Sequence, residues 1–250
     1  TFPVLNAHMI DGNYVMPFAV SLELMAHAAM HENPGLKLAA IKNARVFKGL
    51  VLPQNNPNAE IGLYAGKAVL NAAGLTEVTV ELKARQDGKS YTVAGAVIGL
   101  AGTLAKPQGK APAMSAKTYA LSAKDVYDQV LFHGTILQGI NNITICDANG
   151  AAVTAACLNK PQDIMAHPLR SNLLTDPLAI DSAFQLASLW CFENHKTVSL
   201  PSDFANMQIY GAFKAGKAIR IVLNVTSVKG QIMKGDMRFF DGESVIAEIT

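Results

Sequence analysis

The chain has 250 residues, of which 50% are hydrophobic and 16% are charged, and its formal net charge is +2. This length allows one large domain or two ordinary ones with a substantial core. The small charge excludes the basic surplus that binds nucleic acid or an anionic membrane. Three cysteines without CxxC spacing argue against a disulfide framework or a structural zinc site and favour a cytoplasmic setting. No apolar run approaches the ~20 residues that span a bilayer.

The first half of the sequence predicts one apolar helix followed by strands. Apolar residues recur at helical spacing over Phe18–His31, and an Asn-Pro-Gly sequence then ends the run. The stretches typical of strands are residues 36–52, 59–70, 76–86 and 90–104. The last two are expected to form a hairpin through Asp87 and Gly88.

A linker is predicted at residues 105–118, which are rich in Pro, Gly, Ala and Lys and lack periodicity. It divides the chain into subdomains 1–104 and 119–250. In the second subdomain, helices are expected at 122–132 and 177–194, and strands at 136–146, 151–158, 198–210, 218–227, 230–240 and 244–249.

Each half thus combines one long apolar helix with a run of antiparallel strands. A sheet wrapped around the helix buries it best, and joining two such sheets through their edge strands removes exposed edges. The predicted fold class is α+β. Because the sequence begins at Thr1 and its last segment reads as a strand, we expect a domain of a longer polypeptide.

Two motif-like strings are set aside. Residues 211–218 nearly match a phosphate-binding loop, but Ala218 replaces the required hydroxyl residue and a strand pattern follows where a helix is needed. His27 and His31 are one helical turn apart, yet no clear third ligand accompanies them. No Ser lies in a GxSxG elbow and no Cys has a setting that lowers its pKa, so acid–base chemistry remains.

His8 is the candidate base, in the string HMIDGNYVMP. Gly12 permits close approach of the backbone to a ligand, and the segment through Pro17 leads into the start of the first long helix. Free N–H groups at a helix start stabilise negative charge, which predicts an oxyanion site there.

Asp181 is the candidate acid, in the string DSAFQ on the second long helix. Gln185 follows four residues later on the same helix face, where its amide can hydrogen-bond the carboxyl group and orient it. Asp181 and Gln185 together therefore indicate a supported catalytic group.

These motifs resemble those of polyketide synthase dehydratase domains over essentially the whole chain. Residues 200–210 also match the family segment that follows its second helix. The matching residues are His8, Gly12 and Pro17 of HxxxGxxxxP, Pro177, Asp181 and Gln185 of HPxxLDxxxQ, and Gly134 and Gln138 of YGPxFQGL.

The resemblance implies a double hotdog fold and dehydration of a 3-hydroxyacyl chain carried on the phosphopantetheine of an acyl carrier protein. It implies His8 as base, Asp181 as acid, Gln185 holding Asp181, and the Gly12 amide polarising the thioester carbonyl. It implies no metal and no cofactor. The residues expected to line the substrate tunnel are Pro17, His133, Gly134 and Gln138.

The sequence departs from the family pattern at several positions. Asp176 stands in place of the His of HPxxLD and is explained as a helix N-cap before Pro177. His133 replaces the Tyr of YGPxF, which predicts altered substrate choice or pH response. Thr135 and Leu137 replace its Pro and Phe. The Phe-His-Gly variant resembles dehydratase domains of bacterial polyunsaturated-fatty-acid synthases.

Two alternatives stay open at this point. The same fold and residue pair can serve a cyclase or a double-bond isomerase, and a non-catalytic scaffolding module is the third interpretation. The expected partners are an acyl carrier protein, neighbouring synthase domains and an acyl thioester, with no nucleic acid and no membrane. The resemblance also allows a homodimer through the parent synthase.

Overall fold

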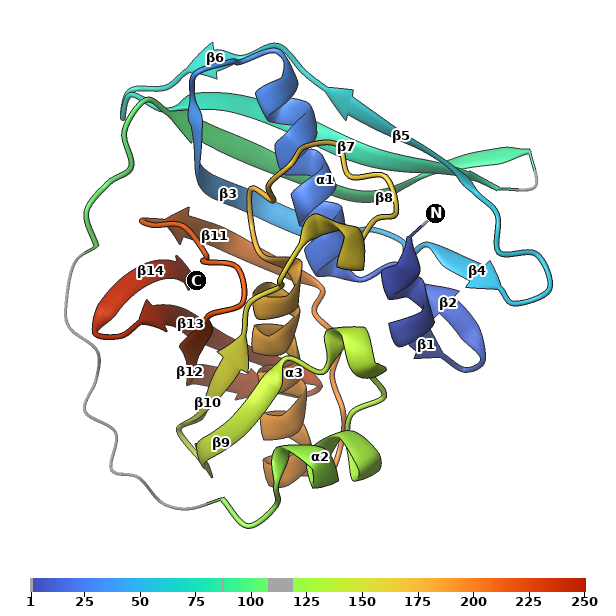
Figure 1. Cartoon of the computed structure of the whole chain (residues 1–250), viewed down its shortest axis with the longest axis vertical. Coiled ribbons are helices and arrows are strands. Elements are labelled where there is room, and N and C mark those ends of the chain that lie inside the picture. Colours follow the sequence, from blue (N-terminus) through green and yellow to red (C-terminus); the bar gives the residue numbers. More distant parts are fainter. Residues whose placement is uncertain (1, 87, 108–118) are drawn as a thin grey trace.

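The computed structural model of the chain describes residues 2–86, 88–107 and 119–250. Two similar units make up the molecule, each with one long helix lying against a curved antiparallel sheet (Figure 1). The helix of the first unit is α1 (Phe18–His31), and that of the second is α3 (Pro177–His195). The predicted α+β class is confirmed.

Helix α1 is buried on nearly all sides, as expected for a helix that is apolar around its whole circumference. It packs against β3, β5, β7 and β8. The strands of the first unit are β1 (Met9–Ile10), β2 (Asn13–Val15), β3 (Lys37–Val46), β4 (Val51–Pro53), β5 (Glu60–Ala65), β6 (Val69–Leu70), β7 (Thr76–Gln86) and β8 (Lys89–Ala101).

Helix α3 occupies the corresponding place in the second unit and packs against β9, β10 and β12. The shorter helical elements of the molecule are η1 (Pro3–Ala7), α2 (Ala123–Gln129), η2 (Thr135–Leu137) and η3 (Pro161–Asp163). The strands of the second unit are β9 (Ile140–Asp147), β10 (Gly150–Ala156), β11 (Asp203–Ile209), β12 (Ala218–Lys229), β13 (Ile232–Asp241) and β14 (Ser244–Ile249).

The two sheets join through β3 and β11, which pair antiparallel with Ile41 opposite Met207. The result is one sheet of 11 strands in the order β5-β7-β8-β3-β11-β14-β13-β12-β10-β9, with β6 paired to β7. Both joining strands would otherwise present unpaired backbone groups. The expectation that the two units join through edge strands is therefore confirmed.

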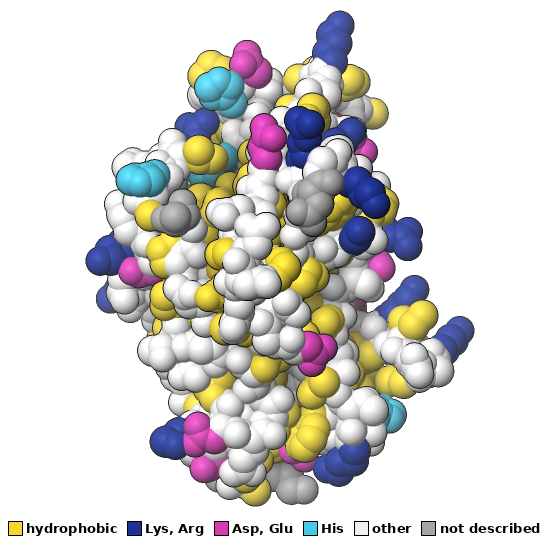
Figure 2. Space-filling model, turned by 90° about the vertical axis from the view of Figure 1, so that its right-hand side faces the viewer, with side chains coloured by type: hydrophobic (Ala, Val, Ile, Leu, Met, Phe, Trp, Pro, Cys, Tyr) yellow, Lys and Arg dark blue, Asp and Glu magenta, His cyan; other side chains and the backbone are white. Residues whose placement is uncertain are grey.

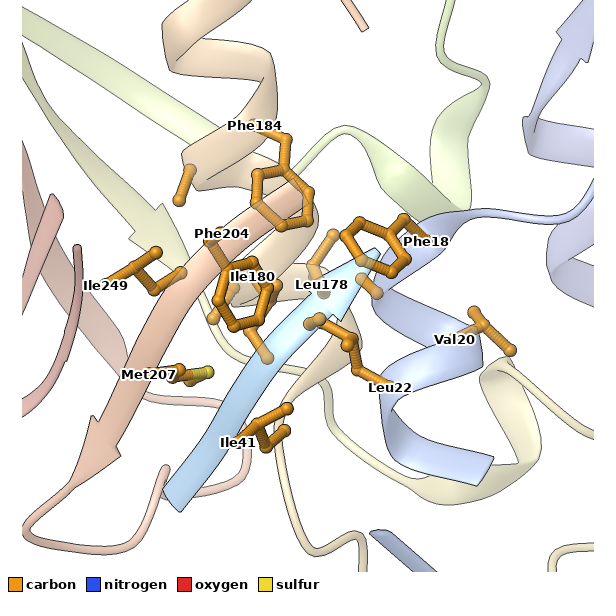
Figure 3. Packing of buried hydrophobic residues seen from close by; sticks show 14 of the residues in the cluster. Phe18, Val20, Leu22, Ile41, Leu178, Ile180, Phe184, Phe204, Met207 and Ile249 are labelled. Atoms are coloured by element: carbon orange, nitrogen blue, oxygen red, sulfur yellow. The ribbon is translucent and has the colours of Figure 1, made fainter. Parts of the chain in front are cut away.

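The two long helices meet at their N-terminal ends. The rings of Phe18 and Phe184 stack with centroids 5.9 Å apart, and Phe204 of β11 lies 6.0 Å from Phe18 (Figure 3). Aromatic pairs in this range contribute about 0.5–1.5 kcal/mol beyond their burial. The core thus runs continuously from one unit into the other at the place where both helices begin.

The observed elements differ from the predicted ones mainly at strand ends. Helix α1 and strand β7 have the predicted bounds. The stretch 36–52 is not one strand, because the chain leaves the large sheet after Val46 and resumes as β4 beside β2. The hairpin of β1 and β2 was not predicted. Of the predicted linker, 108–118 lie outside the described residues, and Asp87 does as well, so the subdomain division stays a prediction.

Charges of both signs and apolar side chains mix on the surface in Figure 2. Lys and Arg gather along one edge in the upper part of this face, the part of the molecule that holds the first unit in Figure 1. Among the residues that the structure describes, no helix combines the length and apolarity needed to cross a membrane.

Candidate active site

His8 lies between η1 and β1 and is 7% exposed. Its Nδ1 is 2.8 Å from the carbonyl oxygen of Val15. Because a carbonyl only accepts, Nδ1 must carry the proton, and Nε2 of the neutral ring keeps its lone pair. Burial lowers the pKa of His8 below its usual 6.5, so the ring is neutral at pH 7.

Asp181 lies in the second turn of α3 and is 4% exposed. Burial raises the pKa of its carboxyl group to about 7, and the hydrogen bond from Gln185 opposes this shift. Gln185 Nε2 donates to Asp181 Oδ2 at 2.7 Å. A substantial part of the Asp181 carboxyl groups is therefore protonated at neutral pH.

A chain of hydrogen bonds fixes Gln185. Its Nε2 also donates to the Leu137 carbonyl at 2.8 Å, so its Oε1 faces the other way and accepts from the Tyr127 hydroxyl at 2.7 Å. The Tyr127 oxygen accepts from the Ile140 amide at 2.9 Å. Sequence reasoning predicted the pairing of Gln185 with Asp181 but missed Tyr127, whose only signal is its place in the predicted helix 122–132.

His133 is the third polar side chain beside this pair. Its Nε2 lies 3.4 Å from Asp181 Oδ2, and its ring stacks on Phe132 with centroids 4.1 Å apart. The centroids of the His8 and His133 rings are 5.4 Å apart. Burial, and then the nearby His8, lower the pKa of His133 to about 3, so this ring is also neutral.

His8, His133 and Asp181 line one cavity of about 220 Å³. Both units contribute to its wall, which is otherwise mostly apolar. The other lining residues include Ile10, Val15, Met16, Phe18, Val46 and Gly49 from the first unit, and Phe132, Phe184, Gln185, Leu200 and Pro201 from the second. An apolar cavity with a few converging polar groups is the usual form of a small-molecule site.

Of the four residues predicted to line the tunnel, His133 is the one that lines this cavity. Pro17 is instead the N-cap of α1. Gln138 donates through Nε2 to the His133 carbonyl at 3.0 Å. The Gly134 amide donates to the Ala7 carbonyl at 2.8 Å, and a Cβ on Gly134 would lie 2.9 Å from Ala7 Cα. These three residues support the cavity from behind.

The position predicted for Gly12 at the start of the helix is wrong. Gly12 lies in the exposed turn between β1 and β2, and its φ of +75° serves that turn. It does not line the cavity. The residue that lies both at the start of α1 and in the cavity wall is Phe18, directly after the cap at Pro17.

The explanation of Asp176 as an N-cap is confirmed. Its Oδ1 accepts from the Ala179 amide at 2.9 Å, and its Oδ2 accepts from the Leu158 amide at 2.9 Å. Burial raises its pKa to about 6. Asp176 therefore fixes the start of the helix that carries Asp181 and does not line the cavity.

Comparison with known proteins identifies the family. Residues 105–250, more than half of the chain, match the family model described as the polyketide synthase dehydratase N-terminal domain. The chain belongs to this family. The matched part includes α3 with Asp181 and Gln185, and the resemblance drawn from the sequence motifs is confirmed.

Solved dehydratase domains share the fold. GphF Dehydratase 1 and the dehydratase domain from the CurF module of curacin polyketide synthase each superpose with a TM-score of 0.74 at 16% identity. Each alignment covers 98% of this chain and 86% of the other. The predicted double hotdog fold, with two long helices each wrapped by an antiparallel sheet, is confirmed.

A curated relative lies in a longer protein, one of the subunits of the polyunsaturated fatty acid synthase from Thraustochytrium sp.. The sequences are 28% identical over 235 residues, or 90% of this chain. The chain spans 8% of the length of that relative.

Proposed function

We propose that this dehydratase domain removes water from a 3-hydroxyacyl thioester and that His8 and Asp181 perform the proton transfers. The observation that carries the proposal is the state of the two groups in one cavity. His8 is neutral with Nε2 free, and Asp181 has a pKa of about 7, which keeps a proton available. Dehydration needs one unprotonated base and one protonated acid facing the same substrate.

In the proposed reaction, His8 Nε2 takes a proton from the carbon next to the thioester carbonyl. Negative charge then develops on the thioester oxygen. The free amides in the first turn of α1, at Phe18 and Ala19, are the donors we assign to it, because Phe18 lines the cavity and Pro17 provides no side-chain cap.

Asp181 completes the reaction by giving its proton to the 3-hydroxyl group, which leaves as water. The product is a 2-enoyl thioester. Gln185 and Tyr127 hold the Asp181 carboxyl group in place, since Gln185 is bonded at both ends of its amide. Among the described residues, Asp181 Oδ1 accepts no hydrogen bond and is free to face the substrate.

The substrate is proposed to arrive on the phosphopantetheine of an acyl carrier protein within a synthase of the polyunsaturated-fatty-acid type, in the cytoplasm. Arg45 and Lys48 are exposed beside the cavity-lining residues Val46 and Gly49, which places positive charge near the first-unit wall for an anionic phosphate. The proposed chemistry requires no metal and no cofactor, because proton transfer and hydrogen bonding suffice.

A second cavity of about 620 Å³ adjoins the first and shares Phe184, Leu200 and Pro201 with it. Its wall continues between the loop around Val198 and the end of the β12–β13 hairpin. This shared apolar wall offers a path for an acyl tail that extends past Asp181.

The test is turnover of a defined 3-hydroxyacyl carrier-protein thioester, followed by mass spectrometry of the acyl product. We expect a product that is lighter by one water, and we expect His8→Ala and Asp181→Asn each to lower the rate about 100-fold or more. His31→Gln is the matched control, because His31 lies on α1 with its side chain 80% exposed. Unchanged turnover in both active-site variants would overturn the assigned roles.

The same product analysis decides between dehydration and the other reactions open to this fold. A shifted double bond on an enoyl thioester indicates an isomerase, and a ring formed from a polyketone indicates a cyclase. If none of these substrates changes, the domain is a scaffold, and the proposed function fails.

A further inference from the structure

His133 adds a third ligand-type side chain to the pair that the proposed reaction uses. His8, His133 and Asp181 each offer one ligand atom, and these three atoms lie within 4.8 Å of one another. All three residues are buried. The proposed dehydration assigns no proton transfer to His133, so its presence beside the pair calls for a separate explanation.

We propose that His8, His133 and Asp181 form a binding site for a divalent transition-metal ion of the zinc class and that the bound ion inhibits the domain. Two imidazole nitrogens and one carboxylate oxygen are a donor set that suits zinc. Three protein ligands leave a fourth position open to water or substrate, as in mononuclear zinc sites of enzymes.

The distances fit this assignment. Zn–N and Zn–O bonds are about 2.0–2.1 Å, so neighbouring ligand atoms in a tetrahedral site lie about 3.4 Å apart. His133 Nε2 and Asp181 Oδ2 are 3.4 Å apart. The His8 nitrogen already lies within 4.8 Å of both partners, and a modest rotation of its ring brings it to bonding distance.

Two of the three ligands have the outer partners that metal sites require. His8 donates from Nδ1 to the Val15 carbonyl, which leaves Nε2 as the ligand atom. Gln185 donates to the Asp181 carboxylate and fixes its plane. Both arrangements match the second coordination sphere of a zinc site, in which backbone carbonyls and side-chain amides hold the ligands.

His133 itself has no strong hydrogen bond that would compete with an ion. Its Nδ1 is buried without a partner among the residues described, and its Nε2 is 3.4 Å from Asp181. Stacking on Phe132 holds the ring in position. The imidazole is thus oriented toward the cluster with a nitrogen that is free to coordinate.

The consequence for activity rests on the proposed function. An ion on His8 Nε2 and on the Asp181 carboxylate occupies the lone pair and the acid that dehydration needs. The ion therefore acts as a reversible inhibitor of this domain and not as its cofactor. A chelator restores the activity by removing the ion.

The test is calorimetric titration of the full chain with Zn²⁺, together with the visible absorption spectrum of added Co²⁺. We expect one ion per chain and a Co²⁺ spectrum typical of four-coordinate N/O ligation. His133→Phe should weaken the Zn²⁺ affinity by roughly 100-fold or more, because losing a ligand exceeds the 10–100-fold effect of losing an outer partner. His133→Tyr, which has the residue of the family motif, should weaken it equally.

His31→Gln is again the control, because its side chain is exposed and outside the cluster, and it should bind like the wild type. Circular dichroism checks that each variant folds. Absence of stoichiometric Zn²⁺ binding by the wild type, or wild-type affinity in folded His133→Phe and His133→Tyr, overturns the proposal. Because titration reads binding without turnover, it decides the metal site even if the proposed dehydration fails.

Discussion

At the residue scale, Asp181 links catalysis to stability. Its pKa of about 7 in the folded chain lies above its ordinary value of 3.8 because it is buried. The folded state therefore holds the proton more tightly than the unfolded state does. The stability from this group is fully present below about pH 4 and is lost as the pH rises through 7, at about 1.4 kcal/mol for each unit of difference in pKa.

Asp181→Asn is expected to stabilise the domain above pH 7 and to have much less effect at pH 4, because the amide carries no charge to desolvate. Urea denaturation at both pH values measures the difference in unfolding free energy. The same difference at both pH values would contradict the raised pKa. The expected gain in stability together with loss of activity is the usual trade-off at a catalytic position.

The pH dependence of turnover follows from the same two residues. His8 must be unprotonated and has a pKa below its usual 6.5, while Asp181 must be protonated and has a pKa of about 7. The proposed activity is therefore bell-shaped, with its maximum between these values, and the two limbs belong to the coupled pair. A rate that rises steadily from pH 6 to pH 9 would contradict this assignment.

Sequence reasoning at this scale found the residues but not their states. The spacing of Asp181 and Gln185 on one helix face predicted their hydrogen bond, which is present. The tautomer of His8 depends on Val15, and the orientation of Gln185 depends on Tyr127 from another helix. Such contacts follow from tertiary packing and have no signature in local periodicity.

At the element scale, the close approach of η1 and η2 sets the distance between His8 and the second unit. The Gly134 amide is bonded to the Ala7 carbonyl, one residue before His8. A side chain at Gly134 has no room, because its Cβ would lie 2.9 Å from Ala7 Cα. This glycine therefore holds the two halves of the candidate site together.

Gly134→Ala should destabilise the domain by roughly 1–3 kcal/mol, as overpacking does, and should lower turnover by displacing His8 from Asp181. Gly102→Ala is the matched control, since no atom lies within 4 Å of the Cβ it would add. Thermal unfolding and dehydration assays measure the two effects. Equal behaviour of the two variants would show that the close contact is not needed.

The predicted elements were most accurate where the helix period or strand alternation was clear, as in α1 and β7. Gly12 was misplaced because the hairpin of β1 and β2 is only a few residues long and shows no periodicity. The break between β3 and β4 is a change of sheet partner, which alternation along one strand does not record.

At the scale of the whole molecule, Glu23 joins the two units. This α1 residue is 0% exposed and accepts hydrogen bonds from the Leu174 amide at 2.8 Å and the Thr175 amide at 2.7 Å. The Thr175 hydroxyl and His27 donate to the same carboxylate. The segment that precedes α3, and with it Asp181, is therefore anchored to α1.

Glu23→Ala should destabilise the domain by about 3–5 kcal/mol, because it leaves buried donors without an acceptor. Glu32→Ala, at a position whose side chain is 83% exposed, should change stability little. Chemical denaturation measures both. A loss below about 1 kcal/mol in Glu23→Ala would show that water replaces the carboxylate. The contact joins residues about 150 positions apart, a separation at which sequence pattern gives no signal.

The central claim is that His8 of the first unit and Asp181 of the second act on one substrate as a unit. The most direct test is a double-mutant comparison of dehydration rates for His8→Ala, Asp181→Asn and the variant with both changes. Residues that act together predict a double variant about as slow as the slower single variant. Wild-type turnover in either single variant, or losses that multiply fully in the double variant, would contradict it.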